Sequence, residues 1–230
     1  MDEKWFYMTK PTSRYFIGSN ETTPYKSCKS KRYITKVMFM VAVSKPIYKE
    51  NGKVLFDRKL GIWPFTYQEP AKLKSKSRVA GTIMTKPIES ITEKVTKECL
   101  INLVIPTIKQ KWSGTASKEI SIQQDNAKPH INGKDKDFLE AATSAGFNIN
   151  LTQQPTNPLD LNILDLSFFR SIQSLQDEHL SRSVEELVKN VQDAYEEETM
   201  ETLDNVWLSL QACMVEIMKL KGTTTTHYHI

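Results

Sequence analysis

The stretch "EISIQQDNAKPH", residues 119–130, decides the fold because it joins a strand pattern to a charged turn. Residues 119–124 are typical of a buried strand, and the strand delivers Asp125 into a turn that holds Asn126, Lys128, Pro129 and His130. Isolated charges are almost never left in a protein core. Asp125 therefore needs a partner, which is another side chain, water or a metal ion.

The composition indicates a soluble globular protein that remains inside the cell. The chain has 230 residues, of which 39% are hydrophobic, enough for one large domain or one domain with insertions. No apolar run is long enough to span a bilayer, and the N-terminus lacks the pattern of a secretory signal. Cys28, Cys99 and Cys213 form no CxxC pair, so we expect reduced thiols.

Charge is distributed unevenly along the chain. Residues 177–204 carry ten acids against Arg182 and Lys189, a net charge of −8, and residues 205–230 carry +1. Since the whole chain carries +4, residues 1–176 hold +11. This basic body predicts a polyanionic partner, although charge alone leaves nucleic acid and a membrane surface as alternatives.

Strand patterns dominate the part of the chain before Asp125. "WFYM", residues 5–8, is typical of the tail of a strand, and "YITKVMFMVAV", residues 33–43, predicts a buried central strand. Asn51-Gly52 predicts a hairpin within residues 47–56. From Gly61 to Pro87 the pattern predicts a long loop with little core of its own. A helix with a capping box at Ser90 and Glu93 should then run to Pro106.

Helix patterns dominate the part after Asp125. Residues 135–146 predict a short helix ended by a glycine, and residues 147–152 predict another strand. Helical spacing over residues 161–175, a cap at Ser183 with Glu186, and an apolar face from Leu203 to Ile217 predict three further helices. Strands followed by alternating strands and helices predict a mixed sheet with helices packed on it.

Asp165 is the second carboxylate of interest. It shares the apolar face of the helix at residues 161–175, so its side chain should point toward the core. The alternative is structural: Asn162 caps the helix and Asp165 is an acid in its first turn, which the helix dipole favours. Asp160 is interpreted as a turn residue. His130 is either a hydrogen-bonded loop residue or part of the site.

Asp2, Asp125 and Asp165 together suit hard cations. Mg²⁺ is bound by one or two carboxylates with water and phosphate oxygens. Two such ions about 3.5 to 4 Å apart support in-line attack on a phosphodiester.

Five blocks of sequence, in order along nearly the whole chain, resemble the mariner-like transposases of plants. The blocks are "DEKWFYMTK" (2–10), "CKSKRYITKVMFMVAV" (28–43), "GIWPFTYQEPAK" (61–72), "QQDNAKPH" (123–130) and "LDLSFFRSIQSLQ" (164–176). In the plant branch of this family, thirty-nine residues separate the second and third catalytic aspartates. The same number separates Asp125 from Asp165 here, which selects Asp165 over Asp160.

The resemblance implies an α/β fold. It would be a ribonuclease H-like mixed sheet flanked by helices, with a loop and hairpin insertion between the first and second catalytic aspartates and a helical C-terminus. The implied division is a catalytic core at 1–177 with the insertion at 46–87, C-terminal helices at 178–221 and a tail at 222–230.

The resemblance also implies a function. Asp2, Asp125 and Asp165 would be the catalytic and metal-binding residues, with Mg²⁺ or Mn²⁺ as cofactor and Asn126 and His130 in support. The activity would be metal-dependent DNA cleavage and strand transfer. The partners would be transposon ends, target DNA and a second copy of the chain, in the nucleus.

The chain departs from the family pattern at three places. The segment Asn157-Pro158-Leu159-Asp160-Leu161-Asn162 has its proline displaced by one position, and Lys128 stands where arginine is usual, which loses the planar fork. Only Met1 precedes Asp2, so the first strand should lack its beginning and the helix-turn-helix region should be missing. We therefore expect a truncated transposase that is inactive alone, with Asp2 poorly fixed.

Basic clusters supply the predicted contacts with DNA, which include Lys128. One cluster holds Lys29, Lys31 and Arg32, and another holds Lys72, Lys74, Lys76 and Arg78 beside Trp63, Phe65 and Tyr67. These aromatic rings are interpreted mainly as anchors of the loop, with base stacking as the alternative. A competing function is a non-enzymatic, transposon-derived DNA-binding or dimerisation protein. A membrane-surface protein is disfavoured because the basic residues lie in loops.

Overall fold

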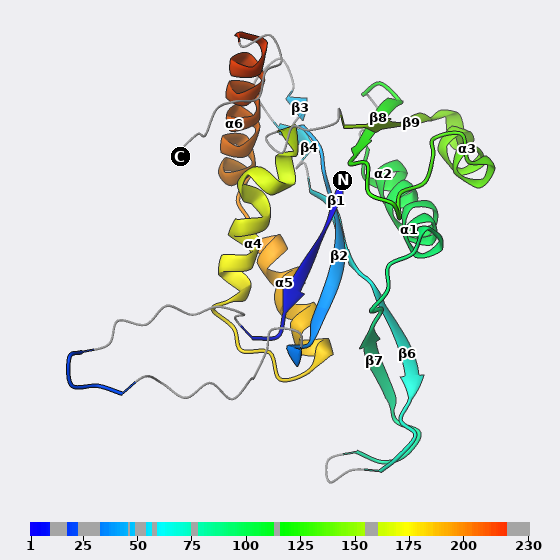
Figure 1. Ribbon diagram of the computed structural model, residues 1–230. Coiled ribbons are helices and arrows are strands. Elements are labelled where there is room, and N and C mark those ends of the chain that lie inside the picture. Colours follow the sequence, from blue (N-terminus) through cyan, green and yellow to red (C-terminus); the bar gives the residue numbers. More distant parts are fainter. Residues whose placement is uncertain are drawn as a thin grey trace.

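The computed structural model describes residues 1–9, 18–22, 33–45, 59–74, 78–112, 116–154 and 161–219, and the backbone alone at 47–48 and 54–56 (Figure 1). Several predicted features lie outside these residues. They are Lys29, Lys31, Arg32, Lys76, the Asn51-Gly52 turn, the segment from Asn157 to Asp160, and the tail at 222–230.

The strands are β1 (Asp2–Tyr7), β2 (Lys36–Val43), β3 (Ile47–Tyr48), β4 (Val54–Phe56), β5 (Lys59–Pro64), β6 (Thr66–Pro70), β7 (Ile83–Pro87), β8 (Glu119–Gln124) and β9 (Asn148–Gln153). The α-helices are α1 (Glu93–Cys99), α2 (Ile105–Lys111), α3 (Lys136–Thr143), α4 (Phe169–Gln176), α5 (Val184–Glu197) and α6 (Met200–Lys219). The segments η2 (Leu100–Val104) and η5 (Leu164–Phe168) are π-helical, and η3 (Ser144–Gly146) is a 3₁₀ turn.

The predicted central strand is β2, which pairs antiparallel with β1 on one side and with β5 on the other. Both of its faces are buried. Val37, Phe39 and Val41 pack into one hydrophobic core, and Met40 and Ala42 pack into the other. Because strand side chains alternate between the two faces, a nearly continuous apolar run is what a strand between two helical layers requires.

The second sheet meets the first at the N-terminus of the chain. β8 and β9 pair in parallel, and the nitrogen of Met1 donates a hydrogen bond to the carbonyl of Gln123 in β8 (2.8 Å). This contact places the start of β1 beside the end of β8 (Figure 1). Asp2 therefore lies next to the turn that begins at Asp125.

Helices cover both faces of this arrangement (Figure 1). One core contains residues of β8, β9, η2, α2 and α3, and the other contains residues of η5, α4, α5 and α6. The prediction of a mixed α/β fold with helices on the sheet is confirmed. Within the described residues no helix is long and apolar enough to cross a membrane.

The prediction of a long loop from Gly61 to Pro87 is wrong. β5 is the third strand of the central sheet, and β6 and β7 form a hairpin that projects from the body (Figure 1). The prediction failed because Pro64, Pro70 and Pro87 are loop signals, yet each ends an edge strand, where proline is tolerated. Gly61 leaves room for the ring of Trp63, which a Cβ at that position would strike.

The expected helix before Asp125 also differs in detail. It begins at Glu93 after Thr92, so the capping box at Ser90 and Glu93 does not form. It continues past Pro106, which lies in the first turn of α2. The π-helical segment η2 precedes α2. A π-bulge accommodates a break in the regular hydrogen-bond ladder of a helix.

The remaining elements follow the sequence closely. α3 and β9 occupy the predicted positions, and Gly146 has a positive φ of 73° at the end of the helical segment. Ser183 Oγ accepts from the backbone N–H of Glu186, as predicted for the cap of α5. The predicted domain boundaries remain predictions.

Candidate active site

Asp2 is the first residue of β1, and its side chain is buried, with 7% of the residue exposed. The expectation of a frayed strand end with a poorly fixed aspartate is wrong. Its Oδ1 accepts from the backbone N–H of Glu3 (2.7 Å), and its Oδ2 accepts from Nδ2 of Asn162 (2.6 Å). Register also fixes the strand, since Asp2 pairs with Val41 of β2.

Asn162 joins Asp2 to Asp165. The same Nδ2 that donates to Asp2 also donates to Asp165 Oδ2 (2.8 Å), while Asn162 Oδ1 accepts from the backbone N–H of Leu164 (3.1 Å). The capping interpretation and the site interpretation of Asp165 are therefore compatible. Asn162 caps the start of the helix and at the same time holds two of the three carboxylates.

Asp125 leaves β8 and enters the turn as predicted. Its Oδ1 accepts from the backbone N–H of Ala127 (2.8 Å) and lies 2.8 Å from Nδ1 of His130. The side chain of Asp125 is 41% exposed, and Asp165 is exposed as well, so the prediction that the Asp165 side chain points toward the core is wrong. Asn126 Nδ2 donates to the carbonyl of Gln154 (2.8 Å) and ties the turn to the end of β9.

His130 is a buried partner of two carboxylates. Its side chain is only 3% exposed, and Nε2 lies 2.9 Å from both carboxylate oxygens of Glu3. Burial alone would lower the pKa of His130, but Glu3, with a smaller contribution from Asp125, raises it to about 9. The imidazole is therefore charged at neutral pH.

The three aspartates share one electrostatic environment. Burial raises the pKa of Asp2 to about 6; the hydrogen bond from Asn162 opposes the shift and the charge of Asp165 adds to it. Burial also raises the pKa of Asp165, which Lys4 and Asn162 lower and Asp125 raises. The carboxylates thus repel one another, and added positive charge would relieve the repulsion.

Lys4 is the basic residue of β1, and its charge lowers the pKa of Asp165. Its Nζ lies 5.3 Å from the centroid of the Phe169 ring. Burial lowers the pKa of Lys4, and Asp165 and Asp2 counteract that shift. No sequence signal pointed to Lys4 or Glu3, and the pattern indicated Asn162 only as a helix cap, because their roles depend on contacts between distant segments.

Divalent ions fit this site by the chemistry of its donors. Among the described residues no group of three or more His, Cys, Asp or Glu side chains is close enough to hold one metal ion. Asp2, Asp125 and Asp165 nevertheless offer carboxylate oxygens, the ligands that Mg²⁺ and Mn²⁺ prefer, and a Mg²⁺ site needs only one or two of them. The residues suit ions completed by water and phosphate oxygens, and they do not form a closed cage.

Replacing Asp2 with asparagine should stabilise the metal-free protein above pH 6. A raised pKa means that the folded state holds the Asp2 proton more tightly than the unfolded state does. The stability that protonated Asp2 contributes is therefore fully present below pH 3.8 and is lost as pH rises through about 6. The loss is about 3 kcal/mol at roughly 1.4 kcal/mol per pKa unit. The amide forfeits one accepted hydrogen bond, so we expect a net gain of about 1–2 kcal/mol.

Urea denaturation in EDTA at pH 5 and pH 8 measures this effect. The wild-type protein should lose stability between these pH values by more than the Asp2→Asn variant does. An equal loss of stability between pH 5 and pH 8 in the two proteins would show that Asp2 is not an unfavourable buried carboxylate.

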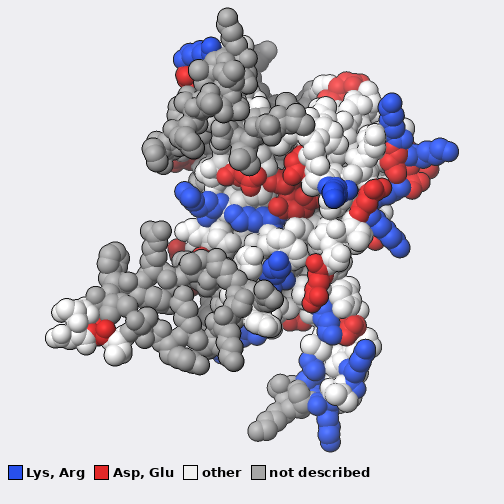
Figure 2. Space-filling view, viewed as in Figure 1, with Lys and Arg blue, Asp and Glu red and all other residues white. Residues whose placement is uncertain are grey.

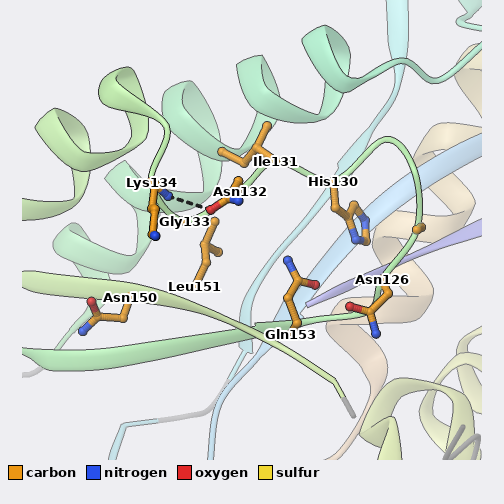
Figure 3. Close-up of a pocket in the computed structure, with 10 residues that line it drawn as sticks. Asn126, His130, Ile131, Asn132, Gly133, Lys134, Asn150, Leu151 and Gln153 are labelled. Atoms are coloured by element: carbon orange, nitrogen blue, oxygen red, sulfur yellow. Dashed lines mark hydrogen bonds between the residues drawn. The ribbon is translucent and has the colours of Figure 1, made fainter. Parts of the chain in front are cut away.

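A polar groove with a volume of about 510 Å³ lies beside the Asp125 turn (Figure 3). It is lined by Asn126, Ala127, His130, Ile131, Asn132, Gly133, Lys134, Asn150, Leu151 and Gln153. The lining contains neutral amides and a lysine and no carboxylate, so it would not repel a phosphodiester chain. Lys128 is exposed in the same turn, between the lining residues Ala127 and His130 in the sequence.

The β6–β7 hairpin carries the described part of the second basic cluster (Figure 2). Lys72 and Lys74 are exposed, whereas Arg78 is half-buried and contacts the sulfur of Met84. Phe65 is 4% exposed and Trp63 packs against the core, as expected for anchors, but Tyr67 is 45% exposed. The two lysines are therefore more available to a ligand than Arg78.

Comparison with solved structures shows that these elements form a ribonuclease H-like fold, which this chain shares with Mos1 transposase. The pre-cleavage Mos1 transpososome is 16% identical with a TM-score of 0.63, and matching covers 98% of this chain and 56% of that one. The Mos1 paired-end complex with the left transposon end is 16% identical with a TM-score of 0.60, and the match covers 96% of this chain and 54% of the Mos1 chain. The Mos1 mariner paired-end complex with Mn is 14% identical with a TM-score of 0.61, covering 98% and 55%.

The chain thus spans about half the length of each of these Mos1 chains. No protein-family model matches the sequence, and a search of curated proteins gives no significant match. At this level of identity the similarity establishes the fold, and the function has to be argued from the site.

Proposed function

We propose that this chain is the catalytic domain of a plant mariner-like transposase, a domain that serves metal-dependent DNA cleavage at transposon ends and transfer of the cut strand; that the chain is inactive when alone stays a prediction. The observation that supports the proposal is that Asp2 and Asp165 share Nδ2 of Asn162, with Asp125 near enough to raise the pKa of Asp165, within a fold shared with Mos1 transposase. The three residues come from distant parts of the sequence. Burial and neighbouring charges raise the pKa values of Asp2 and Asp165, and perturbed pKa values cluster at functional sites.

The residues of this chain have distinct tasks in the proposed reaction. Asp2 and Asp165 present carboxylates whose orientation is set by Asn162, and Asp125 presents a carboxylate held by its own turn. When bound, two divalent ions (Mg²⁺ or Mn²⁺) would stabilise the negative charge on the attacking and leaving oxygens of the phosphodiester. Lys4 adds positive charge beside Asp165.

DNA is the proposed partner, and each of the three Mos1 neighbours is named as a transpososome or paired-end complex. The basic residues of the body and the exposed lysines of the β6–β7 hairpin would neutralise phosphates. We further propose that the chain works as a homodimer in the nucleus.

A non-enzymatic DNA-binding or dimerisation protein is the second candidate. The projecting basic hairpin favours it, because this surface needs no metal to hold DNA. Calorimetric titration with Mn²⁺, run beside a plasmid-nicking assay, separates the two functions. The enzyme requires divalent ions bound through Asp125 and Asp165, whereas DNA binding without any bound divalent ion would support the second candidate.

Neutralising the hairpin lysines should weaken DNA binding without regard to sequence. In a Lys72→Ala, Lys74→Ala variant we expect roughly tenfold weaker binding at low salt, with a salt dependence reduced by about 1 to 2 in the logarithmic slope. Fluorescence anisotropy of a labelled duplex across a series of KCl concentrations measures both quantities.

A Lys94→Ala, Lys189→Ala variant is the matched control for this measurement. It removes the same charge from exposed helical lysines, whose side chains are 83% and 78% exposed. If the control weakens binding as much as the hairpin variant does, the hairpin is not a DNA-binding surface.

A further inference from the structure

Asn162 holds two of the three proposed metal ligands, Asp2 and Asp165, whereas other residues hold the third, Asp125. Asp125 lies in a turn, and turn side chains are mobile unless something fixes them. Its Oδ1 is engaged by the backbone N–H of Ala127 and by Nδ1 of His130. Among the described residues no donor contacts Oδ2, which is the oxygen left for another ligand.

His130 is itself fixed from the other side. Nε2 faces the carboxylate of Glu3, and Glu3 is 10% exposed, so the two side chains form a nearly buried pair. Nδ1 also lies 3.0 Å from the carbonyl oxygen of Asp125. The ring therefore bridges the turn after β8 to β1, and it has little freedom to rotate.

Glu3 owes its place to the geometry of β1. Neighbouring residues of a strand point to opposite faces of the sheet. Asp2 contacts Asn162, at the start of the η5 and α4 helical segment, while Glu3 contacts His130 in the turn after β8. One dipeptide thus reaches two different parts of the cluster.

We propose that Glu3 and His130 are positioning residues that fix the carboxylate of Asp125 so that Oδ2 faces the space shared with Asp2 and Asp165. This inference rests on the proposed function, since it assigns a task within the same site. Partners that orient a ligating side chain change metal affinity by roughly 10- to 100-fold when they are removed. Among the described residues the Glu3 side chain makes no hydrogen bond with Asp2 or Asp165, so its positioning effect on Asp125 would pass through His130.

A simpler role has to be distinguished from this one. The pair could merely anchor the turn and stabilise the fold, as buried ion pairs often do when one partner is removed. Such a role would change the free energy of unfolding and leave the affinity of the folded protein for a metal ion unchanged.

Two substitutions of His130 separate the roles, because they preserve different ends of the imidazole. In His130→Asn the amide nitrogen takes the place of Nδ1 and keeps a donor for Asp125. In His130→Gln the amide takes the place of Nε2, keeps the contact with Glu3 and loses the donor to Asp125. Both remove the ring, so their effects on folding should be similar.

Mn²⁺ affinity of the full chain, measured by the electron paramagnetic resonance signal of free Mn²⁺, is the readout, with thermal unfolding recorded in parallel. We expect His130→Gln to weaken Mn²⁺ binding by about tenfold or more, and His130→Asn to weaken it less. Glu3→Gln should weaken it as well, and the Glu3→Gln, His130→Gln double variant should be no weaker than His130→Gln alone. Lys97→Ala, which breaks a comparable contact with Asp135, should leave Mn²⁺ affinity unchanged.

The outcomes separate this inference from the proposed function. If the wild-type chain binds no Mn²⁺, the proposed function fails. If the wild-type chain binds Mn²⁺ and all the Glu3 and His130 variants that remain folded bind it equally well, the positioning role alone is wrong. Additive losses in the double variant would show that Glu3 does not act through His130.

Discussion

Replacing Asp125 or Asp165 with asparagine should weaken Mn²⁺ binding by more than about 100-fold, beyond the cost of changing an outer partner of a ligand. An amide keeps the shape of the side chain but loses the negative charge that a hard cation needs. Each substitution also lowers the repulsion within the cluster, because Asp125 raises the pKa of Asp165. Stability in the absence of metal should therefore be unchanged or slightly increased in Asp165→Asn, whereas Asp125→Asn also loses the charge interaction with His130.

Calorimetric titration of the two variants with Mn²⁺ measures this effect. Asp135→Asn is the matched control, since asparagine is as good an N-cap as aspartate and Asp135 caps α3 away from the cluster. Wild-type affinity in either site variant would remove that aspartate from the metal site. A loss of the same size in the control would indicate a general effect of charge.

The metal-free protein should lose roughly 3 kcal/mol of stability as pH rises from 6.5 through 9, at about 1.4 kcal/mol per pKa unit. His130 has a pKa raised from 6.5 to about 9 by Glu3 and Asp125, which outweigh its burial. A folded-state pKa above the unfolded value contributes stability that is present below pH 6.5 and is lost as pH rises through 9. Loss of the proton leaves the buried Glu3 without a cationic partner.

Urea denaturation in EDTA from pH 6 to pH 8.5, before thiols such as buried Cys99 contribute, measures this dependence. The His130→Gln variant serves as the reference, and the difference between the two proteins isolates the histidine. A difference that stays constant across this range would contradict a charged His130 in the folded state.

The sequence predicted the positions of Asp125 and Asp165 from local patterns that the structure also shows. Asp125 follows a strand with alternating burial, and this pattern was visible in the residues of β8. Asp165 lies in the first turn of the predicted helix, although the helix there is a π-helical segment. Local periodicity was sufficient to place each residue on its own element, but the choice of Asp165 over Asp160 rested on the spacing that the family resemblance implies.

Contacts between distant segments could not be predicted in the same way. Asn162 was interpreted as a helix cap, which it is, but its donation to Asp2 joins residues 160 positions apart. His130 was assigned only a general supporting role, because its partner Glu3 lies 127 positions away. The β5 strand was missed for a different reason: its terminal proline and Gly61 are loop signals that an edge strand tolerates.

The most direct test of the metal site is anomalous diffraction from crystals of the chain soaked in MnCl₂. The account predicts Mn²⁺ density within ligand distance of Asp125 Oδ2 and of the carboxylates of Asp2 or Asp165. Mn²⁺ bound elsewhere, or a site that leaves Asp125 and Asp165 without contact to any ion at saturating concentration, would contradict it.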